Sequence, residues 1–149
     1  MTLPFDDVPP TVEHDGDTLV VTIPHPPKTK QRPRVTSKGT FTPQQTRDYE
    51  RAVADAYKAA GGPLHQEQLR VHVELHKTHS VVEFTPLAER YTPLRGDIDN
   101  YVKAVLDGLN KVAYADDRQI MEFSAVKVAG TPSKEAARTM RRRKAKVDA

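Results

Sequence analysis

The sequence predicts the α/β (α+β) class, as one small domain in which a mixed β-sheet is flanked by helices. Apolar residues alternate with polar ones over 69–75, which is the period of a strand with one buried face. Over 99–110 they recur at spacings of three and four, which is the period of a helix. A length of 149 residues fits one compact domain. We therefore expect a strand, helix, strand, helix, strand and terminal helix, without an internal repeat.

The first half of the chain opens with prolines and carboxylates, and we expect a flexible acidic leader over residues 1–17. A β-branched run at 19–23, closed by prolines, predicts the first strand. Apolar residues spaced by three and four predict a helix over 43–60, which two glycines and a proline end. The alternating segment at 69–75 is the second strand.

The second half begins with residues 78–95, which have no clean periodicity and which we expect to form a long loop. After the helix at 99–110, alternation over 120–128 predicts a strand with a bulge. A basic, helix-compatible tail follows from 131 to 149. The main domain should therefore span 18–130.

The composition excludes several classes of protein. There is no cysteine, which rules out disulfide scaffolds, thiol nucleophiles and cysteine-based metal sites, and favours a reducing, intracellular setting. No apolar run is long enough to cross a bilayer, and residues 1–7 do not resemble a signal peptide, so we expect a soluble cytoplasmic protein with no membrane partner.

The charge is segregated along the chain, although 23 basic and 20 acidic residues leave a net charge of only +3. The distribution matters more than the sum, because clustered positive charge is what favours nucleic acid. One basic cluster precedes the first helix and the other lies in the tail, which could equally be a solvated helix end or a disordered arm. The members are Lys28, Lys30, Arg32, Arg34 and Lys38, and then Arg138, Arg141, Arg142, Arg143 and Lys144.

The acidic residues around the second helix are the most informative feature. Asp97 and Asp99 would project to the same side of an extended segment, where their charges repel unless a cation lies between them. Asp99 falls where a helix N-cap belongs, and Lys103 lies one turn further on. Magnesium prefers such oxygen ligands. A purely structural role for these aspartates remains an alternative, because Asp99 could cap the helix and Asp97 could pair with Arg95.

The run GDIDNYVKAVLDGLNKVAYADDRQI resembles the central motif of the RusA family of Holliday junction resolvases: D-x-D-N, a lysine four residues after the second aspartate, D-x-L, and a downstream D-D-x-Q. The basic stretch KTKQRPRVTSKGTFTP resembles the N-terminal loop of that family, and the likeness spans roughly residues 20–128. The resemblance implies that Asp97, Asp99 and Asp117 are catalytic carboxylates that bind the metal, with Lys103 as the catalytic lysine. Asp116 and Gln119 would be accessory residues.

The resemblance further implies a Mg²⁺-dependent endonuclease, with Mn²⁺ as a substitute, that acts as a homodimer and resolves four-way junctions by paired symmetric nicks. The two basic clusters would then contact the DNA backbone. Because family members often occur in phages, the site of action would be the host cytoplasm. Two alternatives remain: a nuclease for forks, flaps or other branched DNA, and a branched-DNA-binding protein that does not cleave.

Other chemistries have weak support. His72 and His76 lie four apart in a strand, about 13 Å, which is too far for both to bind one zinc ion. No serine lies in a nucleophile-elbow motif, and no glycine-rich phosphate loop is present. The histidines are better explained as residues of a polar strand face.

Overall fold

A computed structural model describes residues 10–148 of the protein. Its internal contacts divide the chain into two compact units, Met1–Glu89 and Arg90–Ala149. The first unit carries all of the described strands, and the second carries two helices and a short 3₁₀ turn. In the described part of the chain no helix is both long and apolar enough to cross a membrane.

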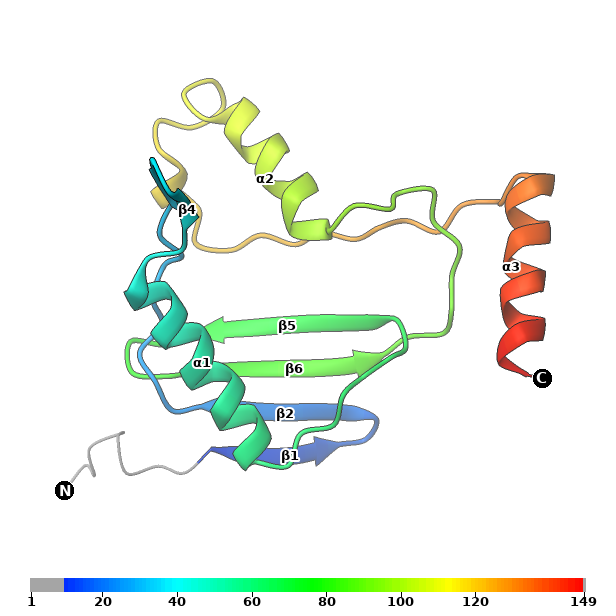
Figure 1. The fold of residues 1–149 in the computed structure, drawn as a ribbon, viewed down its shortest axis with the longest axis horizontal. Coiled ribbons are helices and arrows are strands. Elements are labelled where there is room, and N and C mark those ends of the chain that lie inside the picture. The colour runs from blue at the N-terminus through cyan, green and yellow to red at the C-terminus, as the bar shows by residue number, and fades with distance from the viewer. Residues whose placement is uncertain (1–9, 149) are drawn as a thin grey trace. The chain divides into compact units, whose positions relative to one another are not determined.

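The first unit is built on a four-stranded sheet in the order β1-β2-β6-β5 (Figure 1). Every pairing in it is antiparallel, so sequential hairpins build most of the sheet. Its strands are β1 (Thr11–Asp15), β2 (Thr18–Ile23), β5 (Leu69–Leu75) and β6 (Ser80–Pro86). The predicted α+β class and the strands at 19–23 and 69–75 are confirmed.

The core of this unit lies between β2 and helix α1 (Gln44–Ala59), which crosses one face of the sheet (Figure 1). Leu19, Val21 and Ile23 are buried because alternate residues of β2 point to this face, where Ala56 of α1 meets them. The helix also contributes Tyr57, whose ring packs edge to face on Phe84 of β6 with centroids 5.8 Å apart. The helix predicted over 43–60 is therefore confirmed, and its apolar stripe packs on the sheet.

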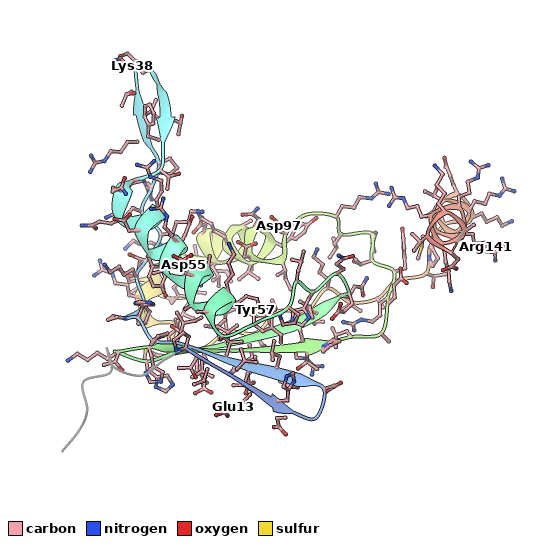
Figure 2. The ribbon with its side chains drawn as sticks, turned by 60° about the horizontal axis from the view of Figure 1, so that its bottom comes forward. Glu13, Lys38, Asp55, Tyr57, Asp97 and Arg141 are labelled. Atoms are coloured by element: carbon pink, nitrogen blue, oxygen red, sulfur yellow. The ribbon has the colours of Figure 1, made fainter. Side chains whose placement is uncertain are left out.

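A second, two-stranded sheet stands apart from this core. Strands β3 (Arg34–Thr36) and β4 (Gly39–Phe41) form an antiparallel hairpin around a turn at Ser37 and Lys38. All six strand residues are exposed. Figure 2 shows Lys38 at the tip of this hairpin, which projects beyond α1. The sequence pattern gave no sign of strands inside the basic segment.

The second unit contains α2 (Ile98–Leu109), the 3₁₀ turn η2 (Asp117–Gln119) and α3 (Lys134–Val147). The two helices confirm the predictions for 99–110 and for the tail. Ser133 caps α3 by accepting a hydrogen bond from the Ala136 N–H at 3.1 Å. The tail is thus a capped helix whose arginines are exposed.

Three expectations about the elements were wrong. Residues 11–15 of the expected leader form β1, because Val12 packs on the core while the carboxylates of this edge strand are exposed. Residues 1–9 of the expected leader lie outside the described part. Residues 80–86 of the expected loop form β6, a central strand whose neighbouring Val81 and Val82 use both sheet faces and so hide the alternation.

The third error is the strand expected over 120–128, which forms none. A strand needs a hydrogen-bonded neighbour, and the described part of this unit, residues 90–148, contains no other strand. Its alternating side chains stay accessible: Met121 is 89% exposed and Phe123 is 68% exposed.

Candidate active site

The site is built on one face of α2. Asp99, Lys103 and Asp107 are spaced by four, so they lie one above another along the helix. The N-cap is Asp97 rather than Asp99, which lies in the first turn. Asp97 caps through its backbone, because its carbonyl accepts from the N–H groups of Asn100 and Tyr101 at 3.1 and 3.3 Å. Its side chain makes no capping bond, so the carboxylate is not committed to the helix end.

A hollow of about 270 Å³ lies beside this face. Three of the predicted catalytic residues, Asp99, Lys103 and Asp117, line it together. Within residues 10–148 the Lys103 ammonium has neither an ion pair nor a hydrogen bond, so it is available to an incoming anion. The remaining lining residues are Val102, Leu106, Asp107 and Phe123.

Asp116 and Gln119 have structural roles in the η2 turn. The Asp116 carboxylate accepts a hydrogen bond from the Arg118 N–H at 2.8 Å, and Gln119 Oε1 accepts from the Asp116 N–H at 2.9 Å. This reciprocal capping box fixes the turn that carries Asp117. The bond from the Arg118 backbone, with a smaller contribution from the Arg118 charge, lowers the pKa of Asp116. The two residues expected to be accessory therefore fix the turn that carries Asp117.

Tyr114 ties this turn back to α2. Its hydroxyl donates to the Leu106 carbonyl oxygen at 2.5 Å, and its backbone carbonyl accepts from the Lys111 N–H at 2.8 Å. The pKa of Tyr114 is raised by burial, and then by the negative charges of Asp117 and Asp107. The hydroxyl bond to Leu106 therefore holds the segment before the η2 turn against α2, which carries Asp107.

Gly96 shapes the entry to α2. The ring of Tyr101 lies against it, and the Gly96 N–H donates to the Tyr101 hydroxyl at 3.2 Å. A Cβ at position 96 would meet this ring at 3.0 Å. Glycine thus permits the close approach that fixes the backbone immediately before Asp97.

The site does not contain a preassembled metal centre. Within the described residues, no three His, Asp or Glu side chains are arranged to hold a metal ion. Asp97 is absent from the lining of the hollow, although the sequence grouped it with Asp99 and Asp117. The chemistry of the proposed donors still suits a hard divalent cation, because the carboxylates of Asp99 and Asp117 line one hollow and carboxylate oxygen is the ligand that Mg²⁺ prefers.

Asp107 is the lining carboxylate that the sequence did not single out as a site residue. Its signal was present, since it lies four residues after Lys103 on the face that begins with Asp99. The two basic clusters belong to other elements: one is in and before the β3–β4 hairpin, and the other is on α3, where Figure 2 labels Arg141. Both clusters are exposed, as backbone contacts to DNA would require.

An α+β protein with carboxylates and an unpaired lysine in one hollow, and with separate exposed basic clusters, has the features of a phosphodiester-cleaving nuclease. The family comparison agrees: residues 24–137 match the model of the family described as endodeoxyribonuclease RusA. This match covers most of the chain, and the chain belongs to that family. No curated protein and no solved structure matches it.

Proposed function

We propose that the protein is a Mg²⁺-dependent endonuclease that resolves four-way DNA junctions by symmetric nicks. The observation that carries the proposal is the hollow in which Asp99, Lys103 and Asp117 meet, on a chain of an endodeoxyribonuclease family. The order of the motif residues supports the assignment, and so does the Lys103 ammonium, which has no ion pair or hydrogen bond within residues 10–148.

Asp97, Asp99 and Asp117 are the proposed ligands of the metal. Bound there, Mg²⁺ would supply Lewis-acid chemistry at a phosphate and offset the mutual repulsion of the carboxylates. Because Asp97 does not line the hollow, we expect ion binding to draw its uncommitted carboxylate toward Asp99. Mn²⁺ should substitute, since it accepts the same oxygen ligands.

Lys103 acts on the substrate directly. Lys103 falls between Asp99 and Asp107 along the helix, and all three residues line the hollow. A phosphate entering there gains an attractive contact, and the negative charge that develops during hydrolysis strengthens it. Apolar Val102 and Leu106, which also line the hollow, reduce the water around the lysine and the phosphate.

We further propose that the active form is a homodimer. A four-way junction has two-fold symmetry, and two identical sites related by a two-fold axis would nick opposing strands as a pair. The measurement is sedimentation in solution, in which twice the mass of the chain is expected. A strictly monomeric enzyme at concentrations that cleave junctions would contradict this part of the proposal.

Cleavage of three labelled substrates, with and without Mg²⁺, tests the function: a mobile four-way junction, a Y-fork and a linear duplex. The proposal predicts Mg²⁺-dependent cutting of the junction with paired nicks, and little cutting of the duplex. Preferred cutting of the fork would instead make the protein a nuclease for other branched DNA. Binding of the junction without any cutting in Mg²⁺ would make it a binding protein.

The identity of the third ligand has its own test. Asp97→Asn should abolish cleavage while preserving junction binding. Asp107→Asn serves as the matched control, because Asp107 lines the hollow but is not a proposed ligand. The control should keep cleavage within a few fold of the wild type. If Asp107→Asn is inactive and Asp97→Asn cuts normally, the ligand assignment is wrong.

A further inference from the structure

The β3–β4 hairpin combines an anchored base with a free tip. At the base, the Gln31 N–H donates to the hydroxyl of buried Thr46 at 3.1 Å, and the Gln31 amide donates to Gln45 at 3.0 Å. Lys30 pairs with Glu50 of α1 at 3.6 Å. These contacts fix the segment that leads into β3 on the first turns of the helix.

The tip has no such contacts. Both faces of the two strands are exposed, and Figure 2 shows the hairpin standing clear of α1 and the sheet. Isolated two-stranded hairpins are at best marginally stable in water. Its internal support is small: the ladder between β3 and β4 and a bond from the Thr36 hydroxyl to the Gly39 carbonyl at 3.2 Å. A hairpin whose strand residues are all exposed is available to a partner.

The charge of the hairpin identifies the class of partner. No acidic residue occurs between Asp17 and Asp48, and this interval contains five basic residues before the helix. Arg34 lies in β3 and Lys38 at the tip. A polyanion such as the DNA backbone is the complementary surface.

One face of the hairpin is not charged. Val35 pairs with Thr40, which places these two β-branched side chains together, opposite the face that carries Arg34 and Phe41. Val35 is 83% exposed. A strand of three residues reaches about 10 Å, comparable to the depth of a DNA groove. An exposed apolar side chain between cations therefore has the form of a wedge that enters a base stack.

We propose that the β3–β4 hairpin is the element that recognises the branch, with Val35 inserted at the branch point and Arg34 and Lys38 on the flanking phosphates. The inference rests on the proposed function, since it presupposes a branched substrate. Base pairs at a branch point have lost a stacking neighbour, so insertion there costs less than within a continuous duplex. The apolar contact thereby confers selectivity, whereas the cations confer affinity for any DNA.

The test is equilibrium binding in EDTA, where no cleavage occurs, to an immobile four-way junction and to a linear duplex of the same arm sequence. Val35→Thr keeps the β-branched shape but removes the apolar character, so the hairpin itself is preserved. We expect it to weaken junction binding about tenfold and duplex binding less than twofold. Lys38→Gln should weaken both by a similar few-fold factor, and Leu64→Ala, at a residue 87% exposed outside the hairpin, should change neither.

A second readout follows insertion directly. A 2-aminopurine base at the branch point should brighten on binding of the wild type and remain dim with Val35→Thr. The proposal is overturned if Val35→Thr binds the junction within twofold of the wild type. It is also overturned if the variant loses junction and duplex binding equally, which is the result expected for a hairpin that lies in the major groove of any duplex. If the wild type still cuts junctions in Mg²⁺ in those cases, only this inference fails. A wild type that neither prefers nor cuts junctions overturns the proposed function as well.

Discussion

Asp116 and Asp117 are adjacent carboxylates at the η2 turn, and we propose different roles for them. Changing each aspartate to asparagine in turn distinguishes the structural role from the catalytic one. Asp116 caps the turn through the Arg118 N–H, whereas Asp117 lines the hollow. Asparagine is as good an N-cap as aspartate, so Asp116→Asn keeps the turn. The accompanying loss of the exposed 3.6 Å ion pair with Arg118 costs at most about 1 kcal/mol. We expect its cleavage to remain within a few fold of the wild type.

Asp117→Asn removes a charge that the proposal places beside a divalent ion. A unit charge about 4 Å away is worth ~1 kcal/mol in bulk water and ~4 kcal/mol at an effective dielectric constant of about 20, and a divalent ion doubles these values. Asp117 is exposed, so we take the lower part of this range, about 2–3 kcal/mol, which corresponds to a loss of roughly 100-fold. Its stability should change by less than about 0.5 kcal/mol.

The assay is single-turnover cleavage of a labelled four-way junction in Mg²⁺, with thermal unfolding followed by circular dichroism for each variant. Both variants should unfold near the wild-type temperature, and only Asp117→Asn should lose cleavage. The reasoning is refuted if Asp117→Asn cuts within threefold of the wild type. It is also refuted if a folded Asp116→Asn loses as much activity as Asp117→Asn.

Three further predictions concern the framework of the two units. Gly96→Ala should lower junction cleavage severalfold, because the new Cβ would push against the Tyr101 ring. Gly108→Ala is the matched control: its Cβ meets nothing within 4 Å, so the change should stabilise α2 by about 0.5–1 kcal/mol. Junction cleavage and thermal unfolding of both variants check this. Val21→Ala, at the residue with 0% exposure, should lower the free energy of unfolding in urea by about 2–3 kcal/mol, and an unchanged midpoint would contradict the placement of the core. The pKa of Asp116 is lowered in the folded protein, so its carboxylate stabilises the fold above the ordinary carboxyl pKa, and this stabilisation is lost as the pH falls through the lowered value. Between pH 5 and about pH 2, Asp116→Asn should therefore lose less stability than the wild type does. Equal losses in the two proteins would argue against the cap.

The sequence predicted the elements whose periodicity comes from a single apolar face. Strand β5 alternates because one of its faces is polar, and α1 and α2 carry continuous apolar stripes. Strand β6 was missed because the consecutive Val81 and Val82 obscure its alternation, and β3 and β4 were missed because an exposed hairpin leaves no hydrophobic pattern. The expected strand at 120–128 has the right alternation but no neighbour among the described residues of its unit.

The shared face of Asp99 and Lys103 was predictable from the sequence, because both residues follow one helix. The spacing of Asp99 and Lys103 dictates a shared face, and the structure adds Asp107 on that face. The position of Asp117 depends instead on the η2 capping box and on the bond from Tyr114 to α2, which no local pattern reveals. The grouping of Asp97 with Asp99 assumed an extended segment, whereas Asp99 already lies in the helix.

We propose that Lys103 and the carboxylates around it cut the phosphodiester bond. The most direct measurement is the single-turnover cleavage rate of Lys103→Met on a junction saturated with protein in Mg²⁺, beside the junction affinity in EDTA. Lys58→Met, at an exposed lysine in the last turn of α1, is the matched control. We predict a rate at least about 30-fold below the wild type with unchanged affinity, and no effect in the control. A Lys103→Met protein that cuts at the wild-type rate would contradict the account.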